Sequence, residues 1–188
     1  MMEHVTPRTW ASPVLAEIWQ ENQAVRTRLI EAARRLSEKQ LAFQPGPGRW
    51  SVGEILDHVC LAERSMTRTI SRLLQQAAGL GRIGHAGPVP AREIDRATYN
   101  QPATAPDGVL PSPDRPLDQL LAGLHESRAR LLEVCAVADG RVVGDVRLAH
   151  VRLGELNFYQ WLAVVGAHDA KHLVQIEAIA SHADFPSA

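Results

Sequence analysis

The sequence predicts an all-α protein, a four-helix bundle with a long crossover between its second and third helices. Two observations carry this prediction. Four segments repeat apolar residues at helical spacing, and an irregular stretch at residues 79–113 separates the second segment from the third. At 188 residues, one core can bury about 70% of the surface that the unfolded chain exposes. We therefore expect a single domain over residues 1–188.

The first predicted helix covers residues 12–37. Two polar residues one turn apart, Asn22 and Arg26, interrupt the centre of its apolar stripe. Three interpretations of this pair stay open: it lines a ligand cavity in which the arginine binds a carboxylate or thiolate, it makes a structural hydrogen bond, or it faces an oligomer partner. The stripe itself consists of Leu15, Ile18, Trp19, Val25, Leu29, Ala33 and Leu36.

The second predicted helix covers residues 51–79. The PGPG stretch at 45–48 cannot continue the preceding helix, because prolines and glycines break it. Ser51 and Glu54 then form a Ser-x-x-Glu capping box directly before an apolar run, which predicts where the helix begins.

The segment that follows holds five glycines and six prolines within residues 79–113 and has no sustained period. So long an irregular segment is unusual in a compact domain unless it has a specific task. A connection between two parallel neighbouring helices is such a task. We expect residues 90–99 to add a short helical turn.

The third and fourth predicted helices cover residues 116–138 and 155–182. Pro116 opens the third at the position where a missing N–H costs nothing. Cys135 lies in its apolar stripe and is expected in the core. Between the two helices, residues 140–151 could be extended for a few positions, but no segment pairs with them convincingly. We therefore expect no sheet.

Two histidines stand four residues apart in the fourth helix. On a helical wheel His168 and His172 both fall on or beside the apolar face, on adjacent turns. A shared metal ion would satisfy two buried imidazoles, but an HxxxH pair alone is a weak signal, and packed or half-exposed histidines are the alternative. His58 lies at the edge of the second helix's apolar stripe. If the second and fourth helices are antiparallel, all three rings reach nearly the same level. Three histidines with open positions resemble a catalytic rather than a structural site.

Two stretches resemble a known family. GRWSVGEILDHVCLAE at 48–63 is similar to the helix 2 signature of the DinB-like superfamily, and HVRLGELNFYQWLAVVGAHDAKHLVQI at 150–176 is similar to its helix 4 signature. The resemblance implies an up-down-down-up bundle in which the crossover joins parallel helices 2 and 3. It also implies a divalent metal held by His58, His168 and His172, with water completing the shell.

The resemblance and the site chemistry predict a metal-dependent enzyme, either a thiol S-transferase or a hydrolase. Some relatives use thiols such as bacillithiol or mycothiol, so a small-molecule substrate or low-molecular-weight thiol is the expected partner. Zinc or nickel fits best, with iron or manganese as alternatives. No general base is evident. Two other interpretations stay open: a non-catalytic, stress-related module that binds a metal or a small molecule, and a scaffold bundle without metal.

One further residue of the fourth helix concerns the site. Asp169 points to the buried side of the fourth helix, where it either accepts a hydrogen bond from a ligand imidazole or pairs with an arginine.

Charge and hydropathy limit the possible partners. A net charge of -1 offers no general attraction for nucleic acid, and no apolar run is long enough to cross a membrane. The stretch MMEHVTPRTW lacks the pattern of a secretory signal, so we expect a cytoplasmic protein and, as is common for such bundles, a homodimer.

Overall fold

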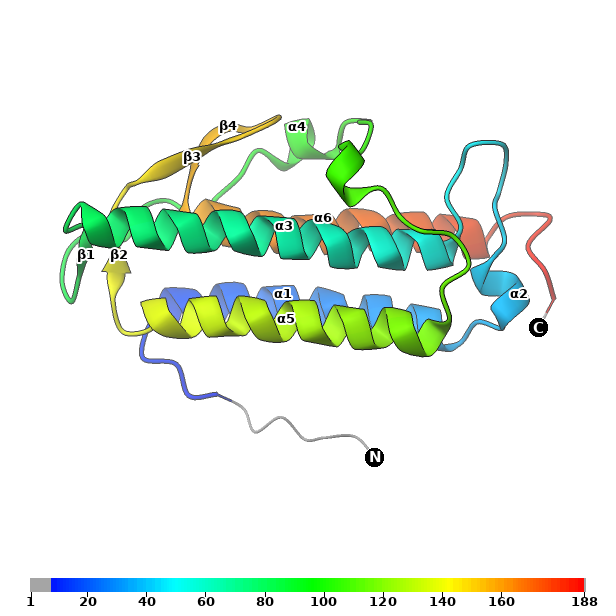
Figure 1. Cartoon of the computed structure of the whole chain (residues 1–188), viewed down its shortest axis with the longest axis horizontal. Helices are drawn as coiled ribbons and strands as arrows, with labels where there is room; N and C mark the ends of the chain where they lie inside the picture. Colours follow the sequence, from blue (N-terminus) through cyan, green and yellow to red (C-terminus); the bar gives the residue numbers. More distant parts are fainter. Residues whose placement is uncertain (1–7, 188) are drawn as a thin grey trace.

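Four long helices form the body of the computed structural model, which describes residues 8–187. The predicted four-helix bundle is therefore present (Figure 1). Helix α1 packs on α6, and α3 packs on both α5 and α6. The four helices are α1 (Pro13–Arg34), α3 (Val52–Gly79), α5 (Leu117–Ala138) and α6 (Phe158–Ala180).

Contacts at successive levels give the directions of the helices. Along α1 and α6, Asn22 bonds to the carbonyl oxygen of Leu162 and Arg26 bonds to Asp169, so these two helices run parallel. Helices α3 and α5 are parallel as well, because a Cβ on Gly123 would meet Cys60, and Arg128 lies on Glu63. The colour order along the ribbons in Figure 1 shows the same directions.

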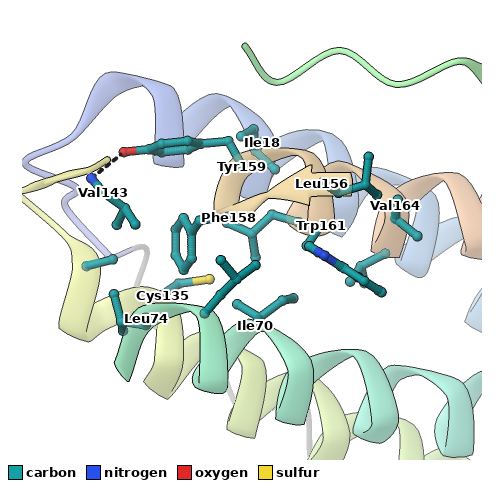
Figure 2. Packing of buried hydrophobic residues seen from close by; sticks show 14 of the residues in the cluster. Ile18, Ile70, Leu74, Cys135, Val143, Leu156, Phe158, Tyr159, Trp161 and Val164 are labelled. Atoms are coloured by element: carbon teal, nitrogen blue, oxygen red, sulfur yellow. Dashed lines mark hydrogen bonds between the residues drawn. The ribbon is translucent and has the colours of Figure 1, made fainter. Parts of the chain in front are cut away.

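Helices α3 and α6 run antiparallel. His58, near the start of α3, meets His172 in the second half of α6, with ring centroids 4.8 Å apart. At the opposite end, Ile70 and Leu74 of α3 share a hydrophobic cluster with Phe158 and Trp161 from the start of α6 (Figure 2). This arrangement brings the three histidines to one level of the bundle.

The first helix is shorter than the predicted 12–37. It ends at Arg34 because Ser37 caps a separate short helix, α2 (Glu38–Leu41), through a reciprocal pair of bonds with Gln40. The start of α3 agrees with its predicted capping box: the Ser51 hydroxyl accepts the Glu54 N–H, and the Glu54 carboxylate accepts the Ser51 N–H at 2.8 Å. The helix ends at Gly79, as predicted.

The expectation that the chain contains no sheet was wrong, because two short antiparallel pairs flank the bundle. The 140–151 stretch supplies a strand to each pair, and one of its partners lies in residues that we assigned to the fourth helix. That helix therefore begins at Phe158 instead of 155, and Asn157 caps it together with Gln160. The pairs are β1 (Ile83–Gly84) with β2 (Val142–Val143), and β3 (Arg147–His150) with β4 (Gly154–Asn157).

The core of the bundle is continuous with these strands. Tyr159 is fully buried, and its hydroxyl accepts the N–H of Val143 in β2 at 3.1 Å (Figure 2). Cys135 is buried in the same cluster, as expected from its place in the α5 stripe. No helix within residues 8–187 has the length and apolarity that crossing a bilayer requires.

The crossover from α3 to α5 contains two short helices, α4 (Arg96–Asn100) and the single-turn η1 (Asp107–Val109). It lies along the α3–α6 side of the bundle (Figure 1). Side chains of the bundle bind its backbone at intervals. Asn157 and Gln160 donate to the carbonyl oxygens of Ala91 and Glu93, and Lys171 donates to that of Gln101 at 3.1 Å.

Candidate metal centre

Three histidine rings converge between α3 and α6. His58 comes from α3, and His168 and His172 come from adjacent turns of α6. One nitrogen from each ring lies within 4.8 Å of the other two. Among residues 8–187, this is the group of side chains whose geometry could hold a metal ion, and it contains only histidines. The structure thus brings together the three residues that the sequence nominated.

Hydrogen bonds determine which ring nitrogen of His58 and of His172 is available to bind a metal. The Nδ1 of His58 lies 2.7 Å from the carbonyl oxygen of Val109, and the Nδ1 of His172 lies 2.7 Å from Oε1 of Gln175. Since both oxygens can only accept, both Nδ1 atoms carry the proton. Each ring therefore directs an unprotonated Nε2 into the site, which is the form that binds a metal.

The distance between the Nε2 atoms of the two α6 histidines suits a metal ion that both would bind. The Nε2 atoms of His168 and His172 are 3.2 Å apart. Two nitrogens about 2.0–2.1 Å from one tetrahedral zinc ion would be separated by about 3.3 Å. The Nδ1 of His168 is buried and has no hydrogen-bond partner in the described part of the chain. His168 is thus the least constrained of the three rings, and the residues present fit a metal ion.

The three imidazoles are neutral at pH 7. Burial lowers the pKa of His58, and it lowers the pKa of His172 to about 4 with help from the charge that His58 would carry. Burial also lowers the pKa of His168 well below 6.5, with further contributions from His172 and His58. Protons therefore compete weakly for these ligands near neutral pH.

An aromatic ring borders the centre beside His58. The ring of Trp50 lies 4.7 Å from that of His58. Helix η1 of the crossover packs against α3 here and supplies the Val109 carbonyl. A side chain that could act as a general base is not part of the ligand group among residues 8–187.

Asn22, Arg26 and Asp169 lie deeper in the bundle. Arg26 holds Asp169 through two bonds of 2.9 Å and reaches Glu63 at 3.0 Å. Arg128 completes the cluster with bonds to Glu63 at 2.7 Å and to Asp169 at 2.8 Å. Each of the four long helices contributes one charged residue to this buried network. Of the interpretations that the sequence left open, the structure places Arg26 in structural hydrogen bonds and pairs Asp169 with arginines.

Several residues of the site were not nominated from the sequence. Glu63 and Arg128 each occupy a position in the apolar stripe of their helix. A charged residue at a position that faces the core is a sequence signal from which both could have been predicted. Gln175 lies three residues after His172 and therefore on the same side of α6. The Val109 carbonyl has no sequence signal at all, because a backbone atom of an irregular segment makes the contact.

The fold and the site define a class: a helical bundle with a cluster of three inward-facing histidines. The match of a family model to residues 21–176 is more specific, and it shows that this chain belongs to the DinB superfamily. A solved structure, the four-helix bundle protein TT2238, is similar, with 25% sequence identity and a TM-score of 0.62 over 87% of this chain and 98% of that one. No curated protein matches the chain.

Proposed function

We propose that this chain is a divalent-metal-dependent enzyme whose metal is held by His58, His168 and His172. The convergence of their nitrogens within 4.8 Å carries the proposal. Membership of the DinB superfamily is compatible with it. Zinc or nickel fits three neutral imidazoles best, with iron or manganese as alternatives.

Thiol S-transfer or hydrolysis is the reaction that suits such a site. A cation that keeps its full charge among neutral ligands lowers the pKa of a bound water or thiol and so supplies a nucleophile near pH 7. The protein's own part is to hold the three rings: Val109 and Gln175 fix two of them by accepting the Nδ1–H, and Trp50 shields one face of His58. The proposed substrate is a small molecule, with a low-molecular-weight thiol as one reactant.

The bundle topology supports the same proposal. The parallel α1–α6 and α3–α5 pairs support an up-down-down-up arrangement, in which α3 runs antiparallel to α6. A homodimer is part of the proposal, and light scattering on the purified protein tests it.

One observation favours a second candidate, a non-catalytic module that binds a metal or a small molecule. The ligand group consists of three histidines and holds no carboxylate, so it does not itself supply an acidic side chain to take a proton from the nucleophile. This candidate predicts a tightly bound metal without turnover.

Metal analysis of the purified protein is the first test. We expect about one equivalent of zinc or nickel in the wild type and none in His168→Ala, whereas His125→Ala, an exposed histidine of α5, retains the metal. Candidate thiols and electrophiles are then incubated with the metal-loaded protein. Equal rates for wild type and His168→Ala would exclude the enzymatic function, and equal metal content would exclude the site.

A further inference from the structure

Asp57 is a buried carboxylate beside the metal-site histidine of α3. Only 1% of its surface is exposed. One of its oxygens accepts the backbone N–H of Ser112 at 2.8 Å, and the other accepts a hydrogen bond from the guanidinium of Arg115. Both partners belong to the last part of the crossover, just before α5. Asp57 therefore binds a segment that approaches α3 from outside the bundle.

The next residue of α3 binds the same segment. The Nδ1–H of His58 donates to the carbonyl oxygen of Val109 at 2.7 Å, three residues before Ser112. Two consecutive residues of α3 thus hold the crossover at points three residues apart. Because the chain between these points is short, fixing the Ser112 N–H limits where the Val109 carbonyl can lie.

The orientation of a ligating imidazole depends on the acceptor of its second nitrogen. For His58 that acceptor is a backbone carbonyl of an irregular segment, and η1 itself has a single turn. Such a segment needs an anchor to present its carbonyl at a constant position. In the described structure, Asp57 supplies two bonds to it and is itself fixed in a long helix.

We propose that Asp57 is a positioning residue for the metal site: it holds the crossover so that the Val109 carbonyl fixes the ring and the tautomer of His58. The proposal rests on the proposed function, since it assumes that His58 binds the metal. Asp57 itself contacts the crossover and does not need to touch the ion.

A double-mutant cycle with nickel as the probe separates this role from a general effect on folding. We measure nickel affinity for the wild type, Asp57→Ala, His58→Ala and the double variant. If Asp57 acts through His58, Asp57→Ala weakens nickel binding by about 10-fold or more in the wild-type background but has little effect once His58 is gone. Asp118→Ala, which removes an exposed aspartate of α5, serves as the control and keeps wild-type affinity.

Equal effects of Asp57→Ala in the two backgrounds would overturn the positioning role while leaving the metal site intact. If the wild type binds no nickel or zinc, the proposed function fails, and this inference fails with it. The ring ¹⁵N shifts of His58 in metal-free protein give a second readout, for which Asp57→Asn is used as the milder variant. We expect the Nδ1–H tautomer in the wild type and a mixture of tautomers in Asp57→Asn; an unchanged tautomer would contradict the proposal.

Discussion

Arg26 of α1 and Asp169 of α6 form a two-armed ion pair inside the bundle, with Nε and Nη2 each 2.9 Å from a carboxylate oxygen. Burial lowers the pKa of Arg26, but the charges of Asp169 and Glu63 outweigh that effect and raise it. The arginine is therefore charged at every accessible pH. Because Asp169 follows His168 directly, the pair also fixes the rotation of α6 at the metal site.

Removing one member of this buried network should lower the stability of the fold. Arg26→Met retains much of the side-chain volume but leaves two buried carboxylates with a single cation, so we expect a loss of about 3–5 kcal/mol in the free energy of unfolding. Urea denaturation measures it. The control is Arg28→Met, two residues after Arg26 on α1. It removes an exposed ion pair with Glu177 and should lower the free energy of unfolding by about 0.5 kcal/mol or less. Equal effects of the two substitutions would contradict the structural role of Arg26.

The stability of the metal-free protein should fall as the pH drops below about 6.5. The unfolded chain binds protons on its histidines in that range, whereas burial lowers the pKa of the folded His172 to about 4. The neutral form therefore stabilises the fold above the unfolded pKa, and this contribution is lost on the way down to the folded pKa. His172 alone accounts for about 3 kcal/mol over this window.

Urea denaturation at several pH values between 7 and 4.5, with chelator present, measures this dependence. Replacing the ring by His172→Gln should flatten the curve. A wild-type stability that is constant between pH 7 and 5 would show that the rings are not buried in the neutral form.

Gln175 should tune metal affinity without touching the ion. Its Oε1 accepts the Nδ1–H of His172, so Gln175→Leu removes the acceptor that holds this ring. We expect metal affinity to fall by about 10-fold or more, as is usual for the second partner of a ligating histidine. Competition with a coloured chelator measures it, and Gln76→Leu on the exposed face of α3 is the control. Identical affinities would mean that His172 is oriented by other contacts.

The close approach of α1 and α6 depends on Gly166. A Cβ at this position would lie 2.1 Å from Oδ1 of Asn22. We expect Gly166→Ala to destabilise the protein by about 1–3 kcal/mol, although alanine favours a helix. The double variant with Asn22→Ala should recover part of this loss, and Gly79→Ala, with open space around it, should be neutral or slightly stabilising. Strict additivity of the two substitutions would contradict the clash.

Much of the site could be predicted from the sequence because its key residues lie on helices. The helical period determines which side of its helix a residue faces, so it placed His168 and His172 on one face. The rise per residue placed His58 at a matching level of the bundle. The strands were missed for the opposite reason. A pair such as Ile83 with Val143 depends on two segments 60 positions apart, and two-residue strands leave no alternating pattern.

Side-chain partners inside the bundle were also only partly predictable. The polar character of Asn22 and Arg26 was visible, but their partners come from other helices and depend on the packing. Sequence periodicity tells which way a residue points along its own helix. It does not tell which charge on a neighbouring helix stands opposite, and so three interpretations of the pair remained until the structure placed Glu63 and Asp169.

The crossover connects the parallel helices α3 and α5, so it runs back along the length of the bundle. The points at which side chains of the bundle bind it are unevenly spaced along the chain. Residues 102–105 pass between the anchor of Lys171 on Gln101 and the turn of η1, whose last residue, Val109, binds His58. Natural variation in chain length should therefore collect in 102–105, where an inserted residue can bulge outward. From Pro106 to Arg115 one added or lost residue would disturb the turn or the anchors that hold the Val109 carbonyl at His58. The same loop thus combines a segment that is free to evolve in length with one whose length is fixed.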